Sequence, residues 1–239
     1  MKILDLTFSS PADNLSCDEV LLEEAETGNG PEILRFWEPK KYFIVLGYSN
    51  AWEKEVRSEA LKSKSVPVFR RSSGGGTVLQ GPGCLNYSLI LNIKENGDCR
   101  NIRATNEHVM ERHRAAIETL TGKKIRVQGH TDLTFNDLKF SGNAQRRKRK
   151  YLLFHGTFLL DFGLSRIDAW LCLPEKQPTY RKNRNHSSFL TNLGISPANV
   201  KKTLEKTWNA KGVLDPIPRG KIKQLTEERY NKDEWNLKF

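Results

Sequence analysis

Residues 69–91 combine the residue types best suited to binding an anion. Two arginines, Arg70 and Arg71, stand directly before two serines and three consecutive glycines at positions 74–76. A run of glycines packs no side chains and loses much conformational entropy on folding, so it indicates a backbone that passes close to a ligand. Its N–H groups can bind an anion, and forked guanidinium groups suit carboxylate or phosphate. A glycine-rich hairpin turn without a ligand is the alternative.

A second segment, residues 139–157, places Lys139 in an apolar run that continues as SGNAQ and ends in HGT. Together the two segments closely resemble the lipoate–protein ligase A family. In that family an RR-x-SGGG-x-V loop, a G-x-LNYS segment, a K-x-SG-x-AQ segment and HGT follow one another in this order. Weaker similarities include Asn14, Asp132 and Trp235, so the resemblance covers nearly the whole chain.

The chemistry that this resemblance implies begins with the activation of an acid. A carboxylic acid does not acylate a lysine amine at a useful rate until its hydroxyl group becomes a good leaving group. The resemblance implies that ATP and Mg²⁺ are used to convert lipoate or octanoate to the acyl-adenylate. The acyl group then passes to a lysine of a lipoyl-accepting protein domain, of the glycine cleavage H-like or acyltransferase type. Because two anions must meet, the site needs cations and preorganised N–H donors. Burying the eight-carbon chain in an apolar tunnel would contribute about 5 kcal/mol, at ~0.8 kcal/mol per methylene.

On the family pattern Lys139 is the catalytic residue, which would contact the mixed-anhydride oxygens. The residues expected to bind the lipoyl-adenylate or ATP are Arg70, Arg71, Ser73, Gly74, Gly75, Gly76, Val78, Gly83, Leu85, Asn86, Ser88, Gly142, Ala144, His155, Gly156 and Thr157. The sequence assigns no metal ligands. The family commonly has a histidine where this chain has Gln80, and a neutral amide cannot shuttle a proton, so no acid–base role is expected there.

The competing enzyme class in the same superfamily is a cysteine-dependent transferase. It moves octanoate from acyl carrier protein, or a lipoyl group from another lipoyl protein, through a thioester. One branch has its cysteine before the lysine, where this chain has none, and another has it after the HG strand, near the position of Cys172. The transferase cysteine lies in a P-C-G turn, whereas residues 171–174 are predicted to end a helix. Cys84 is predicted to be a buried structural thiol. Relatives that bind the ligand without ligating it, or that use biotin, are further alternatives.

The composition agrees with an enzyme that binds acidic partners. We expect residues 1–239 to form a single catalytic domain without a C-terminal accessory domain, which leaves open the need for a separate accessory protein. The net charge of +11 favours a nucleotide or an acidic protein. A non-enzymatic nucleic-acid-binding function is the least favoured alternative, because few aromatic residues alternate with the basic ones. No apolar run approaches the ~20 residues of a membrane span. The four cysteines form no C-x-x-C pair, which favours a reducing cytoplasm.

The hydrophobic pattern predicts an α+β fold with mixed, largely antiparallel sheets flanked by helices. The resemblance implies the catalytic fold of biotin and lipoate ligases, which is related to class II aminoacyl-tRNA synthetases. Strands are expected at residues 2–8, 32–37, 42–48, 66–69, 77–79, 85–91, 124–128, 132–135, 138–144 and 151–160. Helices are expected at residues 16–25, 53–63, 104–121, 197–209 and 220–231.

Three local predictions accompany these ranges. A capping box that begins at Ser16 is expected to open the first helix. Residues 174–188 lack periodicity and are expected to form an exposed basic loop. The five basic residues at 146–150 form either a solvated hairpin tip or a contact for phosphate or a partner protein.

Overall fold

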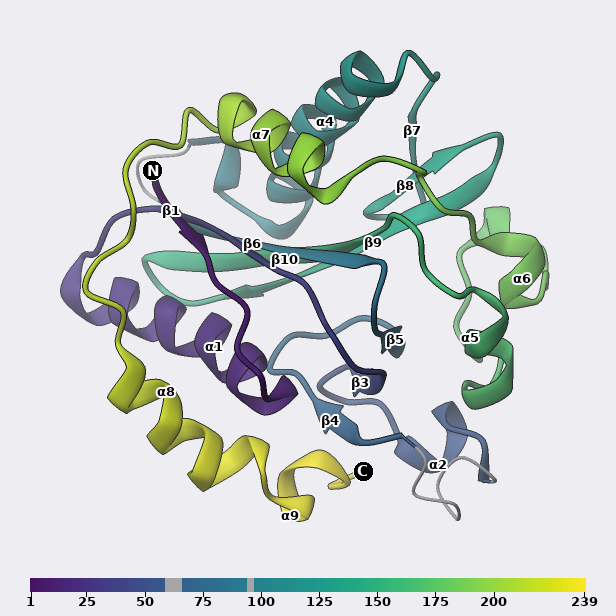
Figure 1. The fold of residues 1–239 in the computed structure, drawn as a ribbon, viewed down its shortest axis with the longest axis horizontal. Helices are drawn as coiled ribbons and strands as arrows, with labels where there is room; N and C mark the ends of the chain where they lie inside the picture. The colour runs from purple at the N-terminus through teal and green to yellow at the C-terminus, as the bar shows by residue number, and fades with distance from the viewer. Residues whose placement is uncertain (59–65, 94–96) are drawn as a thin grey trace.

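Two β-sheets form the centre of the computed structural model, which describes residues 1–58, 66–93 and 97–239 (Figure 1). The larger sheet has the strand order β1 (Lys2–Asp5), β2 (Ile33–Trp37), β6 (Cys84–Asn92), β10 (Tyr151–Leu159), β9 (Leu138–Arg147), β8 (Asp132–Phe135) and β7 (Arg126–Gln128). The smaller sheet has the order β4 (Val68–Arg70), β3 (Phe43–Leu46) and β5 (Val78–Gln80). The pairs β1–β2 and β3–β4 are parallel and the other described pairs are antiparallel, which confirms the predicted fold class.

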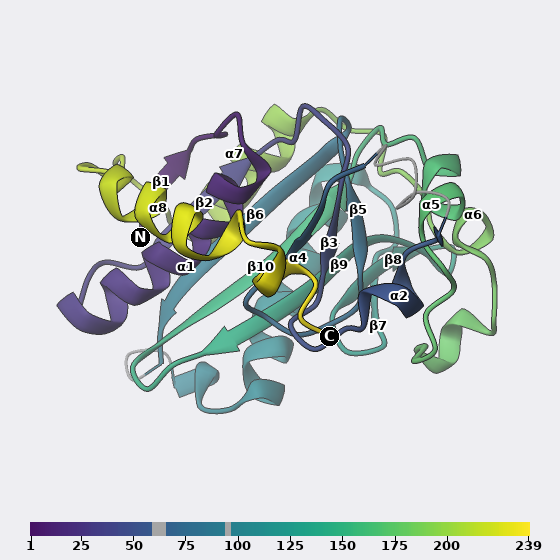
Figure 2. The same ribbon diagram turned by 90° about the horizontal axis from the view of Figure 1, so that it is seen from below.

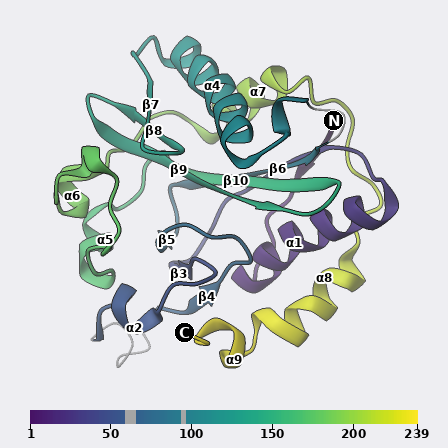
Figure 3. The same ribbon diagram turned by 180° about the vertical axis from the view of Figure 1, so that it is seen from behind.

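Helices cover both faces of the larger sheet. One face lies under α4 (Ile102–Thr121) and α7 (Pro197–Thr207), and the other under α1 (Pro11–Gly28) and α8 (Arg219–Leu225), as Figures 1 and 3 show. The small sheet lies on the same side as α1. The shorter helices are α2 (Trp52–Glu55), α5 (Ser165–Trp170), α6 (His186–Phe189) and α9 (Asp233–Asn236). Single turns occur at η1 (Gly97–Cys99), η2 (Thr179–Arg181) and η3 (Thr226–Tyr230). Within the described ranges, no helix combines the length and the apolar character needed to cross a membrane.

Side chains alternate between the two faces of the central strands β6 and β10, as the pleat of a β-strand requires. Leu85 and Tyr87 of β6 lie in the core beneath α4, whereas Ile90 packs against α1. Further along the α1 face, toward the small sheet, the side chains become polar. These polar residues are Asn86, Ser88, His155 and Thr157. The sheet therefore supports an apolar core on one face and a candidate site on the other.

The start of α1 corrects the predicted capping box. The helix begins at Pro11, not at Ser16, with Ser10 as its extended N-cap residue. Proline fits the first turn of a helix because its missing N–H group would have had no partner there. The Asn14 side chain accepts a hydrogen bond from Phe8 N and donates one to Phe8 O, which fixes the chain entering the helix. Ser16 lies inside the helix and donates to Ile222 O.

Two further predictions need comment. Of the helix expected at residues 53–63, the structure describes only the part before residue 59, where α2 spans Trp52–Glu55, and residues 59–65 lie outside the described residues. Residues 174–188 were expected to form an exposed loop, and this was wrong in part. The segment contains η2 and the start of α6, and both Arg181 and His186 are buried. His186 and Ser187 donate backbone hydrogen bonds to Asp168 of α5, a contact that no sequence periodicity reports.

Candidate active site

The glycine-rich loop between β4 and β5 lies against the polar face of the larger sheet, on the side that Figure 2 views. A Cβ atom on Gly75 would lie 3.6 Å from the Ala144 Cβ atom of β9, and Gly75 has a φ of +91°. A second loop packs on the first: Tyr48 N donates to Ser73 O at 2.9 Å, and a Cβ atom on Gly47 would lie 2.0 Å from Gly75 O. The close contact requires glycine at position 47, and the positive φ favours glycine at position 75, so the two loops and strand β9 form one close assembly.

Arg71 holds the glycine-rich loop from inside. Its Nη2 atom donates to Gly74 O at 2.7 Å and Gly76 O at 2.8 Å, and its Nε atom donates to Ser73 Oγ at 3.1 Å. Arg71 therefore binds carbonyl groups of the loop and does not occupy its N–H groups. Burial lowers the pKa of Arg71 to about 10, so the guanidinium stays charged at neutral pH. Arg71 therefore supplies a fixed positive charge beneath the loop.

Arg70 is also buried, but its guanidinium binds protein carbonyl groups. Nη1 donates to the carbonyls of Gly47, Tyr48 and Asn50 at 2.8–3.1 Å. Nε donates to Trp235 O at 3.1 Å. The structure thus gives Arg70 a visible part in holding the second loop, while its predicted contact with the ligand stays a prediction.

A row of polar groups crosses the sheet beside the loop. Arg35, Ser88 and His155 occupy directly opposite positions on β2, β6 and β10. His155 Nε2 lies 2.6 Å from Ser73 Oγ, which ties β10 to the loop. Asp18 of α1 contacts both ends of this row. Its Oδ1 atom lies 2.5 Å from Arg35 Nη1, and its Oδ2 atom lies 3.8 Å from His155 Nδ1.

The charge state of His155 follows from this environment. Burial lowers the pKa of His155 to about 4, with a smaller contribution from Arg71, while Asp18 acts in the opposite direction. The imidazole is therefore neutral at pH 7. Since Ser73 Oγ receives the Arg71 Nε–H group, its own proton is free to bond to the neutral Nε2 atom. His155 thus positions the loop and carries no charge for the ligand.

Lys139 reaches the same face from β9. Its Nζ atom lies 2.8 Å from Asp132 Oδ1, and its side chain is 26% exposed. A Cβ atom on Gly142 would lie only 2.7 Å from Lys139 Nζ, so the amine passes directly over this glycine. Gly142 pairs with Thr157 of β10. Lys139 therefore passes over Gly142, two residues before Ala144, which lies against the glycine-rich loop, and its predicted catalytic role stays a prediction.

A closed ring of hydrogen bonds adjoins Lys139. Gln80 Nε2 donates to Thr157 Oγ1 at 2.8 Å, Thr157 Oγ1 donates to Asn86 Oδ1 at 2.5 Å, and Asn86 Nδ2 donates to Gln80 Oε1 at 2.9 Å. All three side chains are neutral, and each is satisfied by the other two. The ring joins β5 to β6 and β10 and gives Gln80 a structural part, while the absence of an acid–base role there stays a prediction.

The remaining predicted residues divide into two sets. Val78, Ser88 and Ala144 lie on strands that border the site. Gly83, Leu85 and Gly156 have structural surroundings. A Cβ atom would lie 2.1 Å from Asp161 O at Gly83 and 1.7 Å from Asn143 Oδ1 at Gly156, and Leu85 packs beneath α4. Their predicted ligand contacts stay predictions.

Burial opposes ionisation of three of the four thiols, those of Cys17, Cys84 and Cys99. Burial raises the pKa of Cys84 to about 12 and that of Cys17 to about 11. Cys172 is partly exposed, follows α5 directly, and donates its backbone N–H group to Glu55 O. Within the described ranges, no three His, Cys, Asp or Glu side chains group as a metal site.

The basic run at residues 146–150 pairs with α1. Arg146 Nη1 lies 3.0 Å from Glu19 Oε1, and Lys148 Nζ lies 2.6 Å from Glu23 Oε1. The Glu26 carboxylate accepts the backbone N–H groups of Arg149, Lys150 and Tyr151 at 2.9–3.2 Å. Two side chains of the run therefore form ion pairs with α1, and a third glutamate of that helix binds the backbone of the turn.

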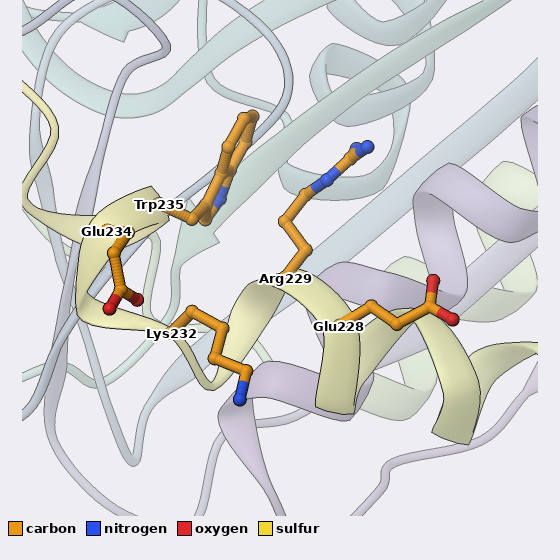
Figure 4. Close-up of a pocket in the computed structure, with 5 residues that line it drawn as sticks. All are labelled: Glu228, Arg229, Lys232, Glu234 and Trp235. Atoms are coloured by element: carbon orange, nitrogen blue, oxygen red, sulfur yellow. The ribbon is translucent and has the colours of Figure 1, made fainter.

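A shallow pocket lies beside the site, at the end of the chain. It is lined by Glu228, Arg229, Lys232, Glu234 and Trp235 (Figure 4). Arg229 and Trp235 point into the molecule, and the Arg229 guanidinium lies 4.9 Å from the centre of the Trp235 ring. Arg229 also donates to the buried Glu19 at 2.8 Å. These contacts hold the segment that binds Arg70, and none of them indicates a catalytic role for the pocket.

Comparison with known proteins agrees with this site. The profile of the lipoyl protein ligase A/B catalytic domain family matches residues 10–207, and the chain belongs to this family. A putative lipoate-protein ligase A of Aeropyrum pernix is 34% identical over 69% of this chain and 60% of its own length. An octanoyltransferase LipM of Geobacillus kaustophilus is 25% identical over 99% of this chain and 98% of its own. A crystal structure of lipoate-protein ligase A bound with ATP has a TM-score of 0.84 and 20% identity over 99% of this chain and 98% of its own, which shows the same fold.

Proposed function

We propose that this chain is an ATP-dependent lipoate–protein ligase, which forms lipoyl- or octanoyl-adenylate and transfers the acyl group to a lysine of a lipoyl-accepting domain. The observation that carries the proposal is the convergence of Lys139 with the glycine-rich loop on one sheet face. A Cβ atom on Gly75 would contact Ala144, and the Lys139 amine passes over Gly142, two residues away on the same strand. One cation thus lies near the loop whose N–H groups would bind the second anion.

The roles of the residues follow from their positions. The loop at residues 74–76, held by Arg71, would bind phosphate through its N–H groups. Lys139 would stabilise the negative charge that develops first on phosphate and then on the acyl carbonyl oxygen. His155, being neutral, would hold Ser73 in place without a proton transfer. No step in this scheme needs a protein nucleophile.

ATP and Mg²⁺ are proposed here for this chain. The arginine-supported glycine loop suits a phosphate chain, and a structurally similar ligase has been solved with ATP. Mg²⁺ usually binds through substrate phosphates and water, with one or two carboxylates. Since the described residues group no metal site, we expect Mg²⁺ to enter with the nucleotide and assign it no protein ligand.

The second candidate is an octanoyltransferase, and the end-to-end similarity to LipM favours it. That reaction needs a thiolate to accept the acyl group. Burial opposes this role for Cys84, whose pKa is raised to about 12. Cys172 is partly exposed and is the thiol to test.

One experiment separates the two functions. The protein is incubated with lipoate and ATP, and pyrophosphate release and lipoyl-adenylate are measured with and without an acceptor domain. Octanoyl-acyl carrier protein without ATP is the parallel substrate. We expect ATP-dependent activity. Lys139→Ala should reduce this activity at least a hundredfold, which corresponds to about 3 kcal/mol of lost transition-state stabilisation, whereas Cys172→Ser and Cys84→Ser should each retain it. ATP-independent transfer together with an octanoyl-Cys172 adduct would assign the transferase instead.

The same assay tests the proposed domain organisation. If residues 1–239 form the whole catalytic unit, adenylate should appear without any other protein. A requirement for a separate accessory protein would show as adenylation that begins only when cell extract is added and that copurifies with one component. The acceptor is proposed to be an acidic lipoyl domain, because the net charge of the chain is +11.

A further inference from the structure

The backbone of Lys139 is contacted by a segment that lies far from it in the sequence. Thr191 N donates to Lys139 O at 2.9 Å, and Lys139 forms an isolated parallel bridge with Leu190. This segment directly follows α6 and lies just beyond residues 174–188, the region in which the sequence shows no periodicity. The backbone of Lys139 is thus held from outside its own sheet.

The side chain of Lys139 is held from the same region through one intermediate residue. Asp132 Oδ1 lies 2.8 Å from Lys139 Nζ, and Asp132 Oδ2 accepts a hydrogen bond from the Tyr180 hydroxyl at 2.7 Å. Both carboxylate oxygens are therefore engaged, each by a different donor. A carboxylate held at both oxygens cannot rotate without breaking one bond, so it defines a single place for the ammonium group.

Tyr180 itself has little freedom. Its ring packs on Phe189 with 5.2 Å between ring centres. Arg184 Nη2 donates to Tyr180 O at 3.0 Å and to Asp137 O at 3.1 Å, which joins the segment to the β8–β9 turn. Gly129, with a φ of +59°, lies beside the ring: a Cβ atom there would be in van der Waals contact with Tyr180 Cε1 at 3.5 Å.

The phenol also keeps its proton. Burial raises the pKa of Tyr180, and the neighbouring Asp132 adds to the shift. The hydroxyl group therefore stays protonated, and remains a donor to Asp132, at every pH at which an enzyme works.

We propose that Tyr180 is a positioning residue for Lys139, acting through Asp132. Tyr180 and Asp132 hold the ammonium over Gly142 before the ligand arrives, so the amine needs no reorganisation during adenylate formation. The kinetic part of this inference rests on the proposed ligase function. Its structural part concerns only the position of the Lys139 amine.

The test compares Tyr180→Phe with Tyr151→Phe. Both lose one tyrosine hydroxyl that donates at 2.7 Å, but the Tyr151 hydroxyl bonds to Gly30 O at the opposite end of β10. We expect Tyr180→Phe to lower kcat for adenylation about tenfold with both KM values within twofold, because a small displacement of a catalytic group costs rate rather than binding. Tyr151→Phe should leave kcat unchanged. Equal kcat values for Tyr180→Phe and the unaltered protein would overturn the inference.

A second measurement separates positioning from general damage. Adding Tyr180→Phe to Asp132→Ala should lower kcat less than twofold further, because the tyrosine then has no carboxylate to orient. A full tenfold additional loss would show that Tyr180 acts by another route.

A third measurement does not depend on activity. The ¹⁵N–¹H cross-peak of the Lys139 ammonium group, identified by its loss in Lys139→Arg, should shift or broaden in Tyr180→Phe and stay in place in Tyr151→Phe. If the unaltered protein forms no adenylate, the proposed function fails while this measurement still decides the inference. An unchanged cross-peak in Tyr180→Phe would refute it.

Discussion

Arg70 and Trp235 each donate a hydrogen bond to the backbone carbonyl group of the other. Arg70 Nε donates to Trp235 O at 3.1 Å, and Trp235 Nε1 donates to Arg70 O at 2.8 Å. The neighbouring Asn236 Oδ1 accepts from Arg70 N at 3.0 Å. Residues 165 positions apart in the sequence thus form one unit, and that unit contains the residue directly before Arg71. The end of the described chain therefore supports the glycine-rich loop.

The first prediction concerns this support. Trp235→Phe removes the indole N–H group and leaves Arg70 O with one donor fewer, so unfolding free energy should fall by about 1 kcal/mol. Urea denaturation measures this change. Trp52→Phe makes the same ring change in the apolar cluster beside α2 and should leave adenylation unaltered. If Trp235→Phe leaves the unfolding free energy unchanged, the Arg70–Trp235 pair does not stabilise the protein.

The second prediction uses Gly142. In Gly142→Ala the new methyl group would lie 2.7 Å from Lys139 Nζ, and the flexible end of the lysine would give way. Adenylation should fall about 100-fold, since a displacement near 1 Å costs that much, while unfolding free energy changes by less than about 1 kcal/mol. Gly220→Ala is the matched control, because nothing lies within 4 Å of a Cβ atom there. Full activity in Gly142→Ala would show that the amine has no required position.

The sequence could predict most of the strands because their alternation of apolar and polar residues matches the pleat of a sheet. It also singled out Gly142, over which the Lys139 amine passes. It could not separate the roles of Arg70 and Arg71, which are adjacent in the sequence and both buried. The carbonyl groups that Arg70 binds belong to loops brought near only by the fold.

The sequence analysis missed Tyr180 for a physical reason. Tyr180 acts through one hydrogen bond to Asp132, and a single polar contact leaves no periodic pattern in the sequence. The capping box at Ser16 was wrong for the converse reason. Its local pattern was present, but the buried pair Asp18–Arg35 needs Asp18 well inside the helix, and Pro11 provides an earlier start.

The third prediction concerns acid stability. Burial lowers the pKa of His113 to about 3 and that of His155 to about 4, both below the value of 6.5 for an unfolded chain. Between these values the unfolded chain binds more protons, so the stability these groups confer is complete above pH 6.5 and is lost as pH falls through the folded pKa. The slope is up to about 1.4 kcal/mol per pH unit for each histidine.

His113→Gln tests this slope. His113 Nε2 accepts a hydrogen bond from Trp208 Nε1 at 2.8 Å, and a glutamine oxygen can replace that acceptor. Urea denaturation from pH 4 to 6 should show a slope lower than that of the unaltered protein by about 1.4 kcal/mol per pH unit. Identical slopes would mean that His113 takes up its proton without unfolding.

The last prediction concerns the basic run and α1. Glu19, Glu23 and Glu26 recur every three or four residues, so they lie on one helix face, and that face meets the β9–β10 turn. Lys148 is paired with Glu23 at 2.6 Å, and Glu26 binds backbone N–H groups of the turn. The turn is thus fixed to α1, the Lys148 charge is paired within the chain, and the Glu26 carboxylate lies next to Arg149 and Lys150.

Two variants follow from this arrangement. Replacing Lys148, Arg149 and Lys150 with serine should change the acceptor's KM, and its dependence on NaCl, by less than twofold, because exposed pairs contribute little and the turn has its own counter-charges. Glu26→Gln should lower unfolding free energy by about 2 kcal/mol, since a charged acceptor of backbone N–H groups is lost. Glu24→Gln is the control, because Glu24 is not one of the three glutamates on that helix face.

A large rise in acceptor KM with a flatter salt response in the triple variant would instead make the run an acceptor-binding surface. Weaker adenylation with an unchanged acceptor KM would place the run over the nucleotide.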